Sequence, residues 1–305
     1  MKTCGPTRTA REKPITGSYG DPEAIRRRST NLVSREVEAL RAAAGWPAEN
    51  VSVGVVEAEA VAATHGDTRR EYRWASVTKP VTALACLVAA EEGTIDLDEP
   101  AGPPCSTFRH LLAHASGLPL EGSSPIARPG ERRIYSDYGF DVLGAALAEH
   151  AEMPFGDYLR EAVLQPLGLG ARFEGRPGSG LAGSLDDLVA IGRELLAPTL
   201  VSAETLVEAT TVQFPGLVGV LPGFGRQEPN DWGLGLELRD RKSPHWTGSR
   251  NSERTFGHFG RSGTFLWVDP EARVALACLT DLTFGEWAVD AWPLLSDAVL
   301  AEVSR

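Results

Sequence analysis

Two kinds of periodicity divide the chain, and their order constrains the fold more than any other feature. Apolar and polar residues alternate with the period of a β-strand near both ends of the chain, whereas the apolar residues from 77 to about 211 mostly follow helical spacing. The predicted strands are 51–56, 58–63, 70–74, 232–238, 255–260, 263–268 and 274–279. This order predicts an α/β fold, in which an antiparallel sheet built from both ends of the chain is flanked by helices and carries an inserted all-helical domain.

The expected domain boundaries follow from this division. Residues 31–75 and 212–305 are expected to form a discontinuous sheet domain, and residues 76–211 a helical domain. A helix over 286–303 is expected to cover one face of the sheet. Residues 1–30 are rich in glycine and proline and poor in apolar side chains, which predicts a flexible leader.

Composition limits the partners. The 305 residues carry a formal net charge of −11, which disfavours binding to nucleic acid or to an anionic membrane. No apolar stretch near the start resembles a signal peptide, and the run 81–90 is too short to cross a bilayer, so a cytoplasmic protein is expected. The four cysteines, Cys4, Cys86, Cys105 and Cys278, have neither metal-ligand nor redox spacing, which favours thiols over disulfides.

Ser76 and Lys79 begin the most apolar helix that the sequence predicts. Residues three apart are neighbours on a helix surface, so the hydroxyl and the amine are expected to touch. An amine walled in by apolar side chains loses proton affinity and can act as a base near neutral pH. The alternative is that Ser76 caps the helix and Lys79 extends its amine to solvent.

The scarcity of lysine strengthens the catalytic interpretation. Only four of the 30 lysine and arginine residues are lysines, and one of them stands at the start of this helix. Arginine stays protonated in proteins, whereas a buried lysine can lose its proton. A chain that otherwise uses arginine therefore has a lysine where a base is useful.

His110 and His114 are four residues apart and could suggest a metal site. No third ligand is near in the sequence and no glutamate lies between them, so capping and packing roles are favoured. The sequence predicts neither a metal nor an organic cofactor.

Several motifs together resemble the serine β-lactamase and penicillin-binding-protein-like hydrolases, most closely the branch of class C β-lactamases, D,D-peptidases and carboxylesterases. They are Ser76-Val77-Thr78-Lys79, then Tyr135-Ser136-Asp137, which is similar to Tyr-x-Asn, and His258-Phe259-Gly260, where the family has Lys-Thr-Gly or His-x-Gly. The stretch from His110 to Pro119 also looks like a family hallmark. The resemblance covers residues 36–305 and implies a β-lactamase/transpeptidase-like fold.

The resemblance also implies roles for these residues. Ser76 is the expected nucleophile, and Lys79 and Tyr135 are expected to share the proton that it loses. The backbone N–H groups of Ser76 and Arg261 are the expected donors to the oxyanion. Asp137, His258, Phe259, Gly260 and Arg261 are the expected substrate-binding residues. For Tyr135 the alternative is an ordinary aromatic residue at a domain interface.

Two departures from the family pattern bear on the substrate. Asp137 stands where asparagine is usual, and an ionised carboxylate accepts hydrogen bonds but cannot donate one to an amide carbonyl. If Asp137 lies beside Lys79, as the resemblance implies for the family's asparagine, its carboxylate is expected to raise the pKa of Lys79. His258 stands where many members have lysine, and a neutral histidine meets a carboxylate only weakly, even with help from Arg261. Esters or a specialised acyl group are therefore favoured over β-lactams and peptides.

Three functions remain open at this stage. The first is a serine hydrolase that acts on a small ester or amide through an acyl-Ser76 intermediate. The second is an acyltransferase in which an alcohol or amine replaces water. The third is a catalytically weak binding protein that keeps the fold. The sequence does not distinguish their natural substrates or acceptors, and it gives no oligomeric state.

Overall fold

The computed structural model describes residues 37–57 and 60–303, so the predicted leader, residues 1–30, lies outside it. The helices are η1 (Glu38–Gly45), η2 (Ala75–Val77), α2 (Thr78–Glu91), α3 (Phe108–Leu112), α4 (Asp137–His150), α5 (Phe155–Leu159), η3 (Arg160–Leu164), α6 (Leu185–Leu196), α7 (Ala203–Ala209) and α8 (Glu286–Val303). The strands are β1 (Val51–Glu57), β2 (Ala60–His65), β3 (Tyr72–Arg73), β4 (Arg172–Phe173), β5 (Leu181–Gly183), β6 (Gly219–Leu221), β7 (Gly225–Gln227), β8 (Glu237–Leu238), β9 (Phe256–Gly260), β10 (Thr264–Asp269) and β11 (Val274–Thr280). None of these helices is long and apolar enough to cross a membrane.

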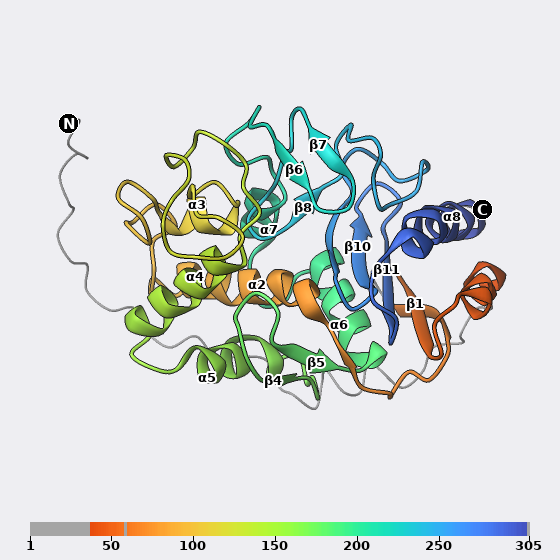
Figure 1. Ribbon diagram of the computed structural model, residues 1–305. Coiled ribbons are helices and arrows are strands. Elements are labelled where there is room, and N and C mark those ends of the chain that lie inside the picture. Colours follow the sequence, from red (N-terminus) through yellow and green to blue (C-terminus); the bar gives the residue numbers. More distant parts are fainter. Residues whose placement is uncertain (1–36, 58–59, 304–305) are drawn as a thin grey trace.

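The main sheet joins the two ends of the described chain. Its six antiparallel strands run in the order β2-β1-β11-β10-β9-β8, and β1 pairs with β11 from Val51 opposite Thr280 to Glu57 opposite Val274. Figure 1 shows this pairing as the orange β1 beside the blue β11. The predicted antiparallel sheet, assembled from both ends, is confirmed.

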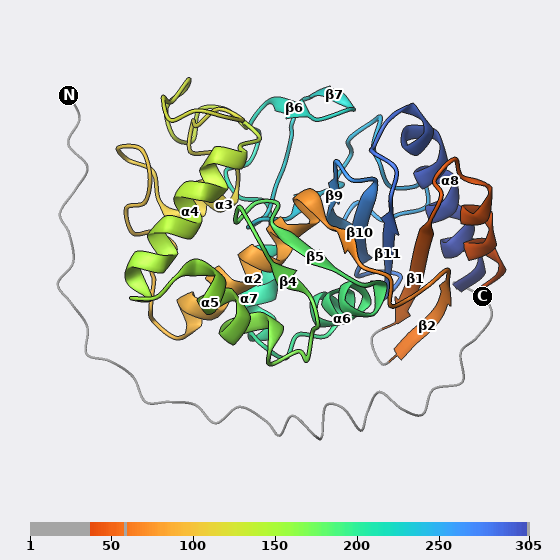
Figure 2. The same cartoon turned by 60° about the horizontal axis from the view of Figure 1, so that its bottom comes forward.

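Helices bury both faces of this sheet. Successive residues of β11 alternate between two apolar clusters: Val274 and Leu276 lie in one with residues of η1 and α8, and Ala275 and Ala277 lie in the other with residues of α2 and α6. Because neighbouring side chains of a strand point to opposite faces, a strand that is apolar throughout requires cover on both sides. The helix predicted over 286–303 is α8, and it covers one face as expected (Figures 1 and 2).

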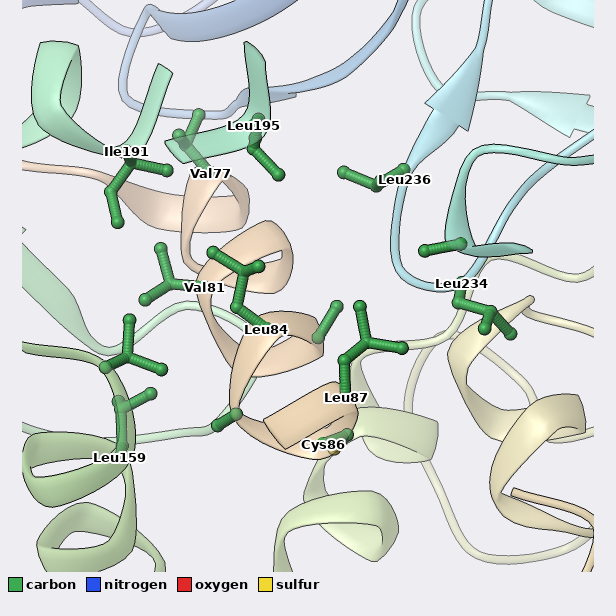
Figure 3. Packing of buried hydrophobic residues seen from close by; sticks show 14 of the residues in the cluster. Val77, Val81, Leu84, Cys86, Leu87, Leu159, Ile191, Leu195, Leu234 and Leu236 are labelled. Atoms are coloured by element: carbon green, nitrogen blue, oxygen red, sulfur yellow. The ribbon is translucent and has the colours of Figure 1, made fainter. Parts of the chain in front are cut away.

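Helix α2 lies at the centre of the larger cluster. Every residue from Thr78 to Ala89 is buried, as expected for a helix that is apolar on all sides. Figure 3 shows Val81, Leu84 and Leu87 of α2 with side chains from α5, α6 and the segment before β8 around them. The start of α2 is consequently held by packing on several sides.

The span 76–211 is less separate from the sheet than the sequence predicts. Short strands β4 and β5 lie within it, and β5 pairs with both β3 and β4 in a second sheet, β3-β5-β4. The predicted strand 70–74 therefore does not join the main sheet. Helix α6 also lies in this span but packs on β1. A Cβ on Gly54 of β1 would meet Val189 Cγ1 at 2.8 Å, which shows how close the helix lies. The division into two domains stays a prediction.

Two predicted elements differ in extent. Residues 155–164 begin as α5 and continue as the π-helical turn η3. In 232–238 only Glu237 and Leu238 form a strand, because the preceding segment turns against α2. Gly235 there has φ of 70°, and a Cβ on it would lie 2.4 Å from the Cβ of Ala83.

The cysteines agree with the sequence prediction only in part. Cys86 and Cys278 are buried free thiols, and burial raises the pKa of Cys86 to about 12. Cys105 is disulfide-bonded, so the preference for thiols is wrong at that position.

A buried ionic cluster fixes the edge of the main sheet at β8. Lys242 is ion-paired with Glu237 and donates to the carbonyl oxygen of Asp231 at 2.7 Å. The second carboxylate oxygen of Glu237 is 2.8 Å from His245 Nε2 and 2.9 Å from Trp246 Nε1. Burial alone would raise the pKa of Glu237, but the charge of Lys242 and the contact with His245 outweigh it and hold that pKa at about 2.

Lys242→Met is expected to destabilise the protein by about 3–5 kcal/mol, because it leaves the Glu237 carboxylate buried without its counter-ion. The neighbouring Arg241, whose side chain is 82% exposed and ion-paired with Glu253, supplies the matched control. Arg241→Met is expected to cause no measurable change. Chemical denaturation at pH 7 measures both. Equal free energies of unfolding for the two variants would contradict a special role of the buried cluster.

Candidate functional site

Ser76 lies in the tight turn η2, directly before α2. Residue Ala75 has φ of 47°, a left-handed conformation that costs a non-glycine residue free energy. Two hydrogen bonds fix Trp74, the residue directly before Ala75: Thr264 Oγ1 donates to Trp74 O at 2.9 Å, and Trp74 N donates to Leu181 O at 3.0 Å. No side-chain cap forms at the start of α2, where the N-cap is Val77, so the alternative that Ser76 caps the helix is wrong.

Lys79 is completely buried, so the alternative of a solvent-reaching amine is wrong as well. Its Nζ donates to Asp137 Oδ1 at 2.5 Å, to Gly178 O at 3.0 Å and, at 3.4 Å, to Ser76 Oγ. These three acceptors match the three N–H bonds of an ammonium group. The contact between Ser76 and Lys79 that the sequence predicts is present.

The Tyr135-Ser136-Asp137 motif sits where a loop enters α4. Ser136 is the N-cap, and its Oγ accepts from Gly139 N at 2.7 Å. This cap fixes the residues on either side of it. Tyr135 OH donates to Ser76 Oγ at 2.8 Å, while Asp137 reaches Lys79, so both side chains converge on the start of α2.

The two histidines of the predicted hallmark have packing roles, as expected. His110 Nδ1 lies 2.9 Å from Oγ1 of Thr107, the N-cap of α3. His114 Nδ1 accepts from Ser136 N at 3.1 Å, and its ring lies 4.6 Å from that of Tyr135. His114 therefore positions the tyrosine. Across residues 37–57 and 60–303, no three His, Cys, Asp or Glu residues are grouped to hold a metal ion.

The pKa shifts of Lys79 and Tyr135 correct one expectation. Burial lowers the pKa of Lys79, but Tyr135 and Asp137 outweigh it, and the pKa is raised above its ordinary value. The prediction, from burial alone, of a lysine poised near neutral pH is therefore wrong, whereas the expectation that a neighbouring Asp137 raises the pKa of Lys79 is confirmed. Burial also raises the pKa of Tyr135, against the opposing charge of Lys79. At neutral pH the resting site holds an ammonium and a neutral phenol.

Strand β9 brings the third motif to Ser76. Gly260 is required there by close approach, since a Cβ on it would lie 2.5 Å from Trp74 O and 3.2 Å from the Cβ of Ala75. The following residue, Arg261, lies in the turn to β10 and lines the same cavity as Ser76. Phe259 also lines it and packs 5.1 Å from the ring of Phe284.

His258 is neutral at physiological pH. Burial, reinforced by the charge of Lys79, lowers its pKa to about 3. Nδ1 lies 2.7 Å from Phe259 O and must donate to it, because a carbonyl oxygen only accepts. Nε2 is then an acceptor, and it has no hydrogen-bond partner within the described residues. A neutral acceptor does not attract a carboxylate, which leaves Arg261 as the cationic side chain on this side of the cavity.

These residues surround one cavity of about 770 Å³. Ser76, Tyr135, Asp137, His258, Phe259 and Arg261 line it. Their apolar neighbours are Leu120, Ile126, Ile134, Val218, Val220, Leu221, Pro222, Trp232 and Phe284, and the other lining residues are Arg132, Arg133, Gly219, Gly223, Arg226 and Glu237. Lys79 does not line the cavity but contacts Ser76 from behind it, and Gly260 lies against Trp74 and Ala75, the residues before Ser76. All eight residues predicted from the sequence are thus brought to one place.

Sequence reasoning missed three contributors. Trp232 and Glu237 line the cavity, and the carbonyl of Gly178 binds Lys79. A backbone carbonyl leaves no sequence signal. For Glu237 a sequence signal did exist, because its ion-pair partner Lys242 is one of the four lysines in the sequence.

Comparison with known proteins tests the family resemblance. A family model described as Beta-lactamase matches residues 35–300. A crystal structure described as a beta-lactamase from Mycobacterium bovis is 55% identical, covers 88% of this chain and 100% of its own, and superimposes with a TM-score of 0.86.

Two further relatives match shorter stretches. Penicillin-binding protein 4* of Bacillus subtilis is 26% identical over 135 residues, and esterase EstB of Burkholderia gladioli is 30% identical over 163 residues. These matches cover 33% and 38% of this chain but only 30% and 41% of the two proteins, so the chain matches less than half the length of either. The family model spans most of the sequence, and the fold is the one expected of it. The chain therefore belongs to the beta-lactamase family.

Proposed function

We propose that the protein is a serine hydrolase that acts on a small ester, or less readily an amide, through an acyl-Ser76 intermediate. The observation that carries this proposal is that Ser76 Oγ, at the wall of an apolar cavity, is contacted by both Tyr135 OH and Lys79 Nζ. A nucleophile needs a base within hydrogen-bond reach, and here two candidates share one oxygen.

In the proposed reaction, the Lys79–Tyr135 pair first loses one proton to solvent. Ser76 Oγ then attacks the carbonyl carbon and passes its proton to the pair, while the N–H groups of Ser76 and Arg261 bind the oxyanion. Collapse of the tetrahedral intermediate breaks the ester C–O bond, and the leaving alkoxide takes the proton from the pair. Water repeats these steps on the acyl-enzyme, which releases the acid and restores Ser76.

Asp137 favours esters over acylamino substrates in this site. Its carboxylate already binds Lys79, and it has no hydrogen to donate to an amide carbonyl. His258 adds an acceptor rather than a cation. We therefore expect short-chain activated esters to be hydrolysed, and penicillins and cephalosporins to be turned over slowly or not at all.

An acyltransferase is the second candidate, because the mostly apolar wall of the cavity would favour an alcohol over water as the acceptor of the acyl group. The chemistry at Ser76 is unchanged in that case. A binding protein without turnover remains the third candidate, since the raised pKa values of Lys79 and Tyr135 leave little base at neutral pH.

Covalent labelling tests the nucleophile. Intact-mass spectrometry after treatment with an activated acetate ester, a penicillin and a fluorophosphonate is expected to show one adduct with the phosphonate and none in Ser76→Ala. Ser123→Ala is the control, because this serine is exposed on the loop between Leu120 and Ile126. A wild-type protein that none of the three reagents labels would favour the binding-protein candidate.

Lys79→Arg is expected to lose most of the esterase activity although it keeps the charge. A guanidinium does not give up its proton, and it is larger than the ammonium that this fully buried position accommodates. Tyr135→Phe is expected to lose ~10²-fold or more in the acylation rate. Burst kinetics with an activated ester measure both. Near-wild-type acylation in Lys79→Arg would show that the base is not Lys79.

Asp137→Asn is expected to shift the acidic limb of the pH–rate profile to lower pH. The deprotonated pair is the active form, so activity rises with pH, and the carboxylate holds the pKa of Lys79 high. Its removal lowers that pKa and makes the active form available at lower pH. The amide also gains a donor, so the ratio of nitrocefin to ester turnover is expected to increase.

Asp141→Asn is the matched control for this change. Asp141 lies one turn further along α4 and is ion-paired with Arg176 rather than with Lys79. Its removal is expected to leave the acidic limb in place. If the limb and the turnover ratio are the same in Asp137→Asn as in wild type, Asp137 does not control the base.

A further inference from the structure

Exposed aliphatic side chains gather at the cavity that contains Ser76. Five large apolar residues of the described chain are exposed, and three of them line this cavity: Leu120 at 51%, Ile126 at 62% and Val220 at 60%. The other two, Val207 on α7 and Leu294 on α8, do not line it. Scattered exposed aliphatic residues are ordinary, but a group at one opening indicates a binding surface. We call Leu120, Ile126 and Val220 the apolar rim.

The apolar rim is held by backbone hydrogen bonds. Leu120 O accepts from Asp137 N and Tyr138 N, both at 3.1 Å, and Ile126 N donates to Gly117 O at 2.9 Å. The bonds at Leu120 tie this side of the rim to the start of α4, which also carries Asp137, and the bond at Ile126 closes the loop onto Gly117. Backbone hydrogen bonds therefore hold Leu120 and Ile126 in place while their side chains remain exposed.

Val220 is fixed from the opposite side. It lies on β6, which pairs with β7 in a hairpin. Arg133 N donates to Val218 O at 3.0 Å, and the buried Arg133 guanidinium donates to Asn230 O at 2.9 Å, so both ends of the hairpin are attached to the residue two positions before Tyr135. Both sides of the rim are thus connected to the segment that supplies Tyr135 and Asp137.

We propose that the apolar rim binds an extended aliphatic chain of the ester substrate, whose carbonyl group lies at Ser76. This inference rests on the proposed function and specifies its substrate class: esters in which one side is an aliphatic chain long enough to reach beyond the cavity wall. The aliphatic chain of the substrate removes the three exposed side chains from water, and each methylene that it buries contributes ~0.8 kcal/mol to the free energy of binding.

The surroundings favour a small-molecule chain over a protein partner. The rim is continuous with the cavity that contains Ser76, and three aliphatic residues fall far short of the roughly 800 Å² per partner that a stable protein interface buries. Arg132 and Arg261 also line this cavity. Their aliphatic stems can line a chain while the guanidinium groups stay in water.

Two homologous ester series test the inference. One varies the acyl chain from two to ten carbons with a constant nitrophenol leaving group, and the other varies the alcohol chain of acetate esters. In wild type, kcat/KM is expected to rise by up to about fourfold per methylene over several carbons in one series, which identifies the side of the ester that the rim binds.

The double variant Ile126→Ser/Val220→Ser is expected to reduce the ratio of octanoyl to acetyl ester kcat/KM at least several-fold. Leu294→Ser, at an exposed leucine on α8, is the matched control and is expected to keep the wild-type ratio. A wild-type rate that does not depend on chain length in either series, or an unchanged ratio in the double variant, overturns the inference while leaving the proposed hydrolase intact.

A binding measurement separates the two proposals if no ester is hydrolysed. In that case the proposed function fails, and Ser76→Ala is titrated with octanoate and acetate while tryptophan fluorescence is followed, because Trp232 lines the cavity. Tighter binding of octanoate that is lost on adding Ile126→Ser/Val220→Ser supports the rim. Equal or absent binding of the two acids overturns it.

Discussion

The site depends on one buried ammonium group and its three acceptors. Lys79 comes from α2, Asp137 from the start of α4, Gly178 from the segment between β4 and β5, and Ser76 from the strained turn η2. An ammonium in an apolar interior is tolerated only when its hydrogen bonds and charge are satisfied. The lysine therefore draws three separate segments of the chain to one point, and the core around α2 keeps water away from Lys79 itself.

Sequence patterns predicted the strands and helices with a clear periodicity and the residues of the candidate site. The sheet from both ends and the meeting of Ser76 with Lys79 follow from periodicity and helical spacing. The second sheet did not: β3 lies within the predicted strand 70–74, but its partners β4 and β5 are two and three residues long, too short for a period to be detected. The proximity of Asp137 to Lys79 followed only from the resemblance, and the direction of the lysine pKa shift depends on that contact.

Lys79 and Lys242 are the two lysines in the described chain, and both are buried and paired with a carboxylate beside the same cavity. The scarcity of lysine thus marks buried cationic positions rather than bases as such. Glu237 and Lys242 have no contact with Ser76; they fix β8 next to β9, which carries His258 and Gly260. Lys79 lies at the proposed nucleophile, whereas Lys242 stabilises the strand that forms the cavity wall.

Asp137 favours the protonated form of Lys79, which can donate a proton but cannot accept one. A lysine with a raised pKa is a poor acceptor for the proton of Ser76, but the protonated form is the one that can deliver a proton to a leaving alkoxide. An activated ester does not need that proton, whereas an unactivated alkyl ester does. In the proposed reaction, the same carboxylate that slows the attack by Ser76 therefore supports the departure of the alkoxide, and this balance suits esters with an unactivated leaving alcohol. The apolar walls strengthen the effect, because every charge interaction at Ser76 acts in a medium of low polarity.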